Sequence, residues 1–90
     1  MEIVISSHAR YKANRRGITL DIVEEVAESP QQEIKSVGGR KICQSKLLDS
    51  DTGRDLLFRV VVKDTGELRY VITVYKTSRI EKYWKENEER

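Results

Sequence analysis

The stretch from Asp55 to Lys76 constrains the fold more than any other part of the chain. Residues 55–63 and residues 67–76 both alternate between apolar and more polar positions, which is typical of half-buried strands. The apolar positions are Leu56, Phe58, Val60 and Val62 in the first segment and Leu68, Tyr70, Ile72 and Val74 in the second. Asp64-Thr65-Gly66 has the composition of a short turn. We therefore predict an antiparallel hairpin over residues 55–76 at the centre of a sheet.

Length and composition limit what surrounds this hairpin. Ninety residues make one domain, because two halves would each be too small to bury a core. The single cysteine, Cys43, excludes an internal disulfide and favours a reducing, cytoplasmic compartment. The N-terminal residues lack the pattern of a signal peptide or membrane span. Charged residues make up 36% of the chain, but the net charge of +2 does not by itself indicate a nucleic-acid-binding protein.

The charges are segregated between two predicted helices. The first, His8 to Arg16, carries four basic residues and no acid, and places His8, Lys12 and Arg16 in one row. Gly17 ends it, and Thr19 is expected to cap an acidic helix over Leu20–Glu28 that stops at Pro30. The apolar stripe of this acidic helix consists of Leu20, Val23, Val26 and Ala27. Two interpretations stay open: solvated helix faces that attract each other, or a basic helix that binds phosphate.

The remaining segments complete an α+β fold. We expect strands at residues 2–6, 33–37 and 40–48, the last toward a sheet edge, and a loop at residues 49–53. A final helix follows Ser78, whose spacing to Glu81 predicts a capping box. The sequence thus predicts one α+β domain over residues 1–90. It has a mostly antiparallel sheet of four to five strands, two N-terminal helices and one C-terminal helix, with the helices on one face.

The residue inventory narrows the chemistry. The chain has one histidine, one cysteine and no glycine-rich phosphate loop, so we expect neither a metal nor a cofactor. The D-x-D-x-G spacing at residues 49–53 lacks the later glutamate of a calcium loop. Histidine, arginine, lysine, tyrosine and threonine remain. They suit RNA cleavage by the ribose 2'-hydroxyl, which needs a base, an acid and cations.

Two regions supply candidate site residues. His8 is the candidate for proton transfer, although a structural role is equally consistent with one isolated histidine. Arg59, Thr73 and Tyr75 would form a phosphate-binding floor on the central hairpin. Arg40 and Lys76 could extend this floor from the strand ends. Alternate polar residues are also ordinary on a solvated sheet face. His8 and Arg59 can share a site only if the first helix lies at an edge of the sheet.

Several motifs resemble a known family. They are S-x-H-A-R-Y-K-A-N-R-R-G-I-T from Ser6 to Thr19, the Gly-Gly-Arg that ends at Arg40, and V-I-T-V-Y from Val71 to Tyr75. Together they resemble the domain-of-unknown-function family 4258, over about His8 to Tyr75. That family is similar to the barnase, EndoU, colicin and RelE-like ribonuclease fold. The resemblance implies a metal-independent ribonuclease of toxin type that acts on RNA and is held by a cognate antitoxin protein.

These observations lead to two hypotheses. In the first, the protein is an endoribonuclease with catalytic residues His8, Arg59, Thr73 and Tyr75. Its phosphate-binding residues would be Lys12, Arg16, Arg40 and Lys76. In the second, the same basic face binds RNA or an acidic protein without turnover. The sequence leaves the oligomeric state open.

Overall fold

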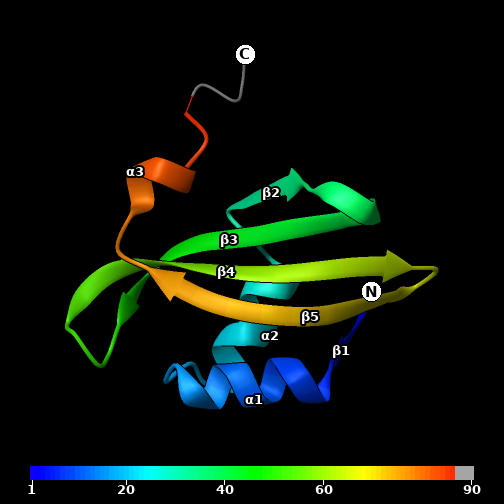
Figure 1. Cartoon of the computed structure of the whole chain (residues 1–90), viewed down its shortest axis with the longest axis horizontal. Coiled ribbons are helices and arrows are strands. Elements are labelled where there is room, and N and C mark those ends of the chain that lie inside the picture. Colours follow the sequence, from blue (N-terminus) through cyan, green and yellow to red (C-terminus); the bar gives the residue numbers. More distant parts are fainter. Residues whose placement is uncertain (87–90) are drawn as a thin grey trace.

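Five strands form one mixed sheet in the order β1-β5-β4-β3-β2, with helices at both ends of the chain (Figure 1). The computed structural model describes residues 1–86. The strands are β1 (Glu2–Ile5), β2 (Gln32–Lys35), β3 (Arg40–Asp49), β4 (Arg54–Thr65) and β5 (Leu68–Thr77). The helices are α1 (Ser7–Arg15), α2 (Leu20–Glu28) and α3 (Ile80–Tyr83), and a 3-10 turn, η1, spans Val37–Gly39. The predicted α+β class is confirmed. β1 pairs with β5 in parallel, and the other pairs are antiparallel.

The predicted central hairpin is confirmed as β4 and β5. Its turn is shorter than the sequence indicated, because Thr65 still pairs with Leu68 and only Gly66 and Glu67 lie between the strands. Gly66 has a φ of 61°, a conformation that glycine adopts without strain. β3 lies one position inside the sheet, and β2 forms the edge that the sequence assigned to β3.

A β-bulge overturns the predicted apolar face of β5. Val71 lies opposite Val62 and Thr73 opposite Val61, so Ile72 is the extra residue. The extra residue reverses the alternation within the strand. Val71 and Val74 are therefore both buried in the core, whereas Tyr70 is exposed. The prediction for β4 holds, because Leu56, Phe58, Val60 and Val62 all enter the core.

The main core lies between the sheet and the first two helices. α1 contributes Ala9 and Ala13, and α2 contributes Val23, Val26 and Ala27. Ser6 caps α1 by accepting a hydrogen bond from the amide of Ala9, and Thr19 caps α2 in the same way through Ile22. The predicted bounds and cap of α2 are confirmed. Leu20 is exposed, so the apolar stripe of α2 is one residue shorter than predicted.

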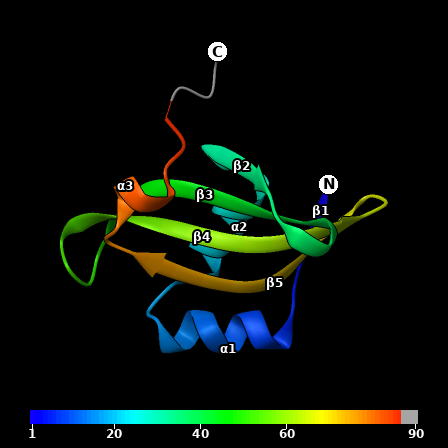
Figure 2. The same cartoon turned by 45° about the horizontal axis from the view of Figure 1, so that its top comes forward.

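α1 lies along the edge of the sheet beside β5 (Figures 1 and 2). β1 pairs only with Leu68–Val71, so the second half of β5 has β4 on one side and no strand on the other. Ser6 donates from its backbone amide to the carbonyl of Val71 and from its hydroxyl to that of Ile72, and Arg16 Nη1 donates to that of Val74. Ser6 and Arg16, which flank α1, thus satisfy three carbonyl groups along this edge of β5.

α3 lies on the sheet face opposite α2, so the prediction that all helices share one face is wrong. Tyr83 of α3 contacts Arg59 and Gln44, whose neighbours Val60 and Cys43 enter the core on the other side. Figure 2 shows α3 in front of the strands and α2 behind them. The predicted capping box is also absent, since α3 starts after Arg79 with no side-chain cap.

Candidate functional site

Four polar residues form a continuous row across the sheet face that α3 partly covers. Gln32, Gln44, Arg59 and Tyr75 lie directly opposite one another on β2, β3, β4 and β5. Gln44 Nε2 donates to Gln32 Oε1 at 2.8 Å, and Arg59 Nε donates to Gln44 Oε1 at 2.8 Å. Arg59 Nη1 donates to the Tyr75 hydroxyl at 2.6 Å. We call these four residues the polar ladder.

Arg59 is buried without a counter-ion among residues 1–86. Its exposed fraction is 6%, and its polar partners are the neutral side chains of Gln44 and Tyr75. The ring of Tyr83 lies 4.2 Å from its Cζ atom. A buried guanidinium without a carboxylate partner has a strong electrostatic preference for an anion. The ladder therefore has the charge and the hydrogen-bond donors that a phosphate group requires.

Arg69, which the sequence placed on the same face as Tyr75, lies on the helical side instead. The bulge at Ile72 reverses its orientation, and it donates to both oxygens of Asp64, to Glu33 and to the carbonyl of Ala27 at the end of α2. Hydrogen bonds from Arg69, assisted by Lys41, lower the pKa of Asp64 from 3.8 to about 2. The charge of Arg69 is thus fully paired with Asp64 and Glu33. The cluster holds elements of the fold together and leaves none of its described cations free for a ligand.

Cys43 lies beside this cluster. Arg69 Nη1 is 3.4 Å from its Sγ atom, yet burial outweighs that charge and raises the pKa of the thiol to about 11. Cys43 is therefore a neutral core residue at physiological pH.

Lys76 follows Tyr75 near the C-terminal end of β5 and pairs with two acidic residues. Its ammonium group lies 2.7 Å from Asp49 and 3.4 Å from Asp51. Burial acts to lower the pKa of Lys76, but the hydrogen bonds to these carboxylates outweigh it and the pKa is raised. Lys76 thus stays charged but neutralised, and the structure does not bring it to the ladder as a free phosphate ligand.

The basic row of α1 is positioned at the edge of β5. The hydrogen bond from Arg16 to Val74 is 3.0 Å long and places the guanidinium next to the backbone of Tyr75. Lys12 precedes it by one turn and is half-buried. His8 is exposed near the start of α1, and no side-chain hydrogen bond joins it to any other residue within 1–86. α1 lies at the edge of the sheet, as a shared site requires, but His8 is eight residues, or about 12 Å along the helix axis, from Arg16.

The structure separates Arg40 from this site and leaves Thr73 near it. Arg40 lies opposite Lys63 and four residues from Gln44, which corresponds to about 13 Å along the strand. Thr73 is half-buried and lies opposite Val61, two residues before Tyr75 along β5 and on the same face.

Sequence reasoning missed Gln32, Gln44 and Tyr83. The two glutamines lie in strands of mixed polarity, where nothing in the sequence distinguishes them from other polar residues. Their alignment becomes visible only when the register of β2, β3 and β4 is known. Tyr83 belongs to the C-terminal helix that the sequence predicted, but its position over Arg59 depends on the path of the chain after β5.

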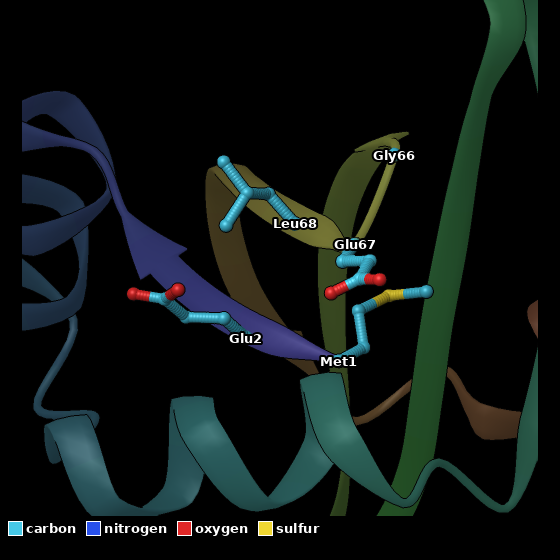
Figure 3. Close-up of a pocket in the computed structure, with 5 residues that line it drawn as sticks. All are labelled: Met1, Glu2, Gly66, Glu67 and Leu68. Atoms are coloured by element: carbon cyan, nitrogen blue, oxygen red, sulfur yellow. The ribbon is translucent and has the colours of Figure 1, made fainter.

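A hollow at the other end of β5 does not suit an anion. Met1, Glu2, Gly66, Glu67 and Leu68 line it (Figure 3), and its two ionisable side chains are both acidic. Leu68 is seven residues from Tyr75 along the strand, or roughly 23 Å. This hollow is therefore separate from the ladder.

The fold and the ladder define a small α+β domain with an anion-attracting row of polar groups across its sheet. Residues 5–76 match the family described as Domain of unknown function (DUF4258), and the chain belongs to that family. The match includes the whole ladder and ends before α3. No curated protein and no solved structure matches the chain. Within residues 1–86, no helix is long and apolar enough to cross a membrane.

Proposed function

We propose that this protein is a metal-independent endoribonuclease that binds RNA along the polar ladder and the adjoining edge of β5. The observation that carries the proposal is the buried Arg59, which donates to the Tyr75 hydroxyl and has no carboxylate partner within residues 1–86. Arg69 and Lys76, whose side chains are 8% and 15% exposed, are by contrast both neutralised by acids. A charge left unpaired in this way is available to an RNA phosphate.

The side chains around the ladder supply the chemistry that RNA cleavage needs. The 2'-hydroxyl attacks the adjacent phosphorus, a base accepts its proton, and an acid donates a proton to the departing 5'-oxygen. Because Tyr75 already accepts a hydrogen bond from Arg59, its own proton can be directed at the phosphate or the leaving oxygen. His8 is the second proton-transfer group, and Thr73 would position the phosphate. Arg59, Arg16 and Lys12 would stabilise the charge that develops on the phosphorane.

The resemblance to the barnase, EndoU, colicin and RelE-like fold supports the same proposal. It extends the proposal to a toxin whose activity is restrained by a cognate antitoxin. The basic row on α1 is compatible with an acidic partner, because that row has no ion pair within residues 1–86.

A second function is a binding module without turnover. Two observations favour it: Tyr83 covers Arg59, and His8 lacks a described hydrogen-bond partner that would hold it as a base. Under this alternative, the ladder binds RNA or an acidic protein, and loss of His8 changes nothing.

Labelled RNA incubated with the purified protein and a chelator tests the proposal. We expect products that end in 2',3'-cyclic phosphate. Tyr75→Phe should lower the cleavage rate by about 100-fold or more while RNA binding persists, since only the acidic proton is lost. His8→Ala should have a similar effect. Tyr70→Phe on the same strand is the matched control and should cleave at the wild-type rate.

The alternatives give different results. If the wild-type protein and every variant bind RNA but do not cleave it, the protein is a binding module and not an endoribonuclease. Absence of both binding and cleavage at low salt would remove RNA as the partner.

A further inference from the structure

The chain after β5 returns across the polar ladder. Residues 79–86, which we call the C-terminal strap, include α3 and follow the part of the chain that matches the family. The ring of Tyr83 stacks on the guanidinium of Arg59, and the carbonyl of Tyr83 accepts a hydrogen bond from Gln44 Nε2 at 3.2 Å. The strap therefore contacts the two central members of the ladder.

Gln32 binds the backbone of the strap through both ends of its amide. Gln32 Nε2 donates to the carbonyl of Lys85 at 2.8 Å, and Gln32 Oε1 accepts from the amide of Lys85 at 3.1 Å. One residue earlier, the ring of Trp84 lies 4.0 Å from the ammonium group of Lys46. A hollow lined by Gln31, Gln32, Glu33, Ile34 and Lys85 opens beside these contacts.

The strap is attached more weakly than the strands. α3 has only four residues, no side-chain cap and no buried residue. The strap contacts the ladder through three hydrogen bonds and one cation–π contact, and segments with few buried apolar contacts open without global unfolding. The strap can thus leave the ladder while the sheet stays folded.

The groups that the strap presents match those of a nucleobase. Tyr83 places an aromatic face on a guanidinium, and Lys85 places a donor and an acceptor side by side against a glutamine amide. An unstacked base offers the same combination, since its face stacks on arginine and its edge carries neighbouring donors and acceptors. Every RNA base has such an edge, so this resemblance predicts binding without strong base preference.

We propose that the ladder is a nucleobase-binding subsite for single-stranded RNA and that the C-terminal strap occupies it in the closed protein. RNA and the strap then compete for Arg59, Gln44 and Gln32. The inference rests on the RNA binding of the proposed function. It adds that a base, and not only a phosphate, contacts the ladder, and that the strap restrains binding.

Tyr83→Ala tests the competition in the full-length chain. Binding is measured by fluorescence anisotropy with a labelled ten-nucleotide single-stranded RNA and with an abasic RNA of the same length. We expect Tyr83→Ala to strengthen binding of the base-containing RNA by about three- to tenfold, the range expected for loss of one cation–π contact. Binding of the abasic RNA should be unchanged. Tyr70→Ala, an exposed tyrosine elsewhere on β5, is the matched control and should not strengthen either.

Two further variants keep the test decisive. Trp84→Ala removes the contact of the strap with Lys46 and should also strengthen binding of the base-containing RNA. It replaces Tyr83→Ala in the test if that variant does not fold. Adding Gln32→Ala to Tyr83→Ala should remove the base-dependent gain, since Gln32 would contact the base edge.

The results separate this inference from the proposed function. If Tyr83→Ala and Trp84→Ala both bind RNA as the wild-type protein does, the strap does not compete with RNA. The proposal that the protein binds RNA would still stand. An equal gain for normal and abasic RNA would show that the strap only shields a phosphate site, which overturns the base subsite. If neither the wild-type protein nor any variant binds RNA at low salt, both proposals fail.

Discussion

Two arginines with the same exposure have opposite electrostatic environments. Arg59 and Arg69 are each 6% exposed, but only Arg69 has acidic partners. The fold gains from Arg69, because it pairs with Asp64 and satisfies a carbonyl at the end of α2. Arg59 has no such compensation within residues 1–86, and a buried uncompensated charge is typical of a site that trades stability for binding.

Replacing each arginine with methionine tests this difference. Arg69→Met leaves two acids without their main partner and should lower the free energy of unfolding by about 2–3 kcal/mol, less than for fully buried pairs because Glu33 is partly exposed. Arg59→Met should lower it by about 1 kcal/mol or less, since it removes the cost of a buried charge while it frees Gln44 and Tyr75. Urea denaturation measures both. Equal losses would mean that Arg59 is a structural residue.

Two features require glycine at position 17: its backbone conformation and the close approach of Asp51. Its φ is 68°, and a Cβ atom at this position would collide with the carboxylate of Asp51. Gly38 has a φ of 69° with open space around it, so it isolates the backbone effect. We expect Gly38→Ala to lower stability by about 1 kcal/mol and Gly17→Ala by about 0.5–1 kcal/mol more, because Asp51 must also leave Lys76. Thermal denaturation distinguishes the two variants, and identical shifts would contradict the collision.

At the scale of elements, the Arg69 cluster joins β2, β4 and β5 to the end of α2. Asp64 is its most strongly perturbed acid, with a pKa of about 2 in the folded chain against an ordinary value of 3.8. A carboxyl whose pKa is lowered by folding stabilises the fold above its ordinary pKa, and this contribution disappears as the pH falls through the folded value.

The stability of the wild-type protein should therefore decrease between about pH 4 and pH 2. Asp64→Asn should lower stability at pH 7 by on the order of 2 kcal/mol and make the curve flatter over that acid range. Lys41→Met should give a smaller change, since Arg69 is the larger cause of the shift. Urea midpoints measured from pH 7 to pH 2 test this, and an unchanged acid slope in Asp64→Asn would contradict it.

Local patterns predicted individual elements well where one residue type decides the structure. Thr19 and Pro30 bracket α2 as expected, and the alternation from Leu56 to Val62 identified the buried face of β4. The bulge at Ile72 has no comparable signal, because any residue of an apolar strand can be the extra one. The bulge puts Arg69 and Tyr75 on opposite faces of the sheet, so only Tyr75 joins the ladder.

The candidate site was only partly predictable for a related reason. Arg59 and Tyr75 share one hairpin, so alternation alone placed them together. Gln32, Gln44 and Tyr83 join them through the pairing of β2 with β3 and the path of the chain after Thr77. These long-range contacts depend on packing of the whole domain, and a sequence pattern within one segment does not contain them.

At the scale of the whole molecule, the basic helix and the ladder meet along one edge of the sheet. Arg16 contacts β5 beside Tyr75, and Lys12 precedes it on the same side of α1. The acidic surface of α2 lies on the other face of the sheet from α3, away from the ladder (Figure 2). An RNA strand that crosses the ladder can therefore continue over α1 without passing the acidic residues of α2.

Neighbouring arginines on α1 provide the final test of this path. Arg16 reaches the edge of β5, whereas Arg15 donates to the hydroxyl of Tyr11 at 2.8 Å on the exposed side of the helix. Arg16→Gln should weaken RNA binding by about three- to tenfold and reduce the slope of log affinity against log salt by about 0.7, the value for one lost phosphate contact with a single strand. Arg15→Gln removes the same charge and should change the slope by much less. Equal effects of the two variants would indicate general attraction to a basic helix, and only a difference between them supports an RNA path that runs from the ladder over the edge of β5.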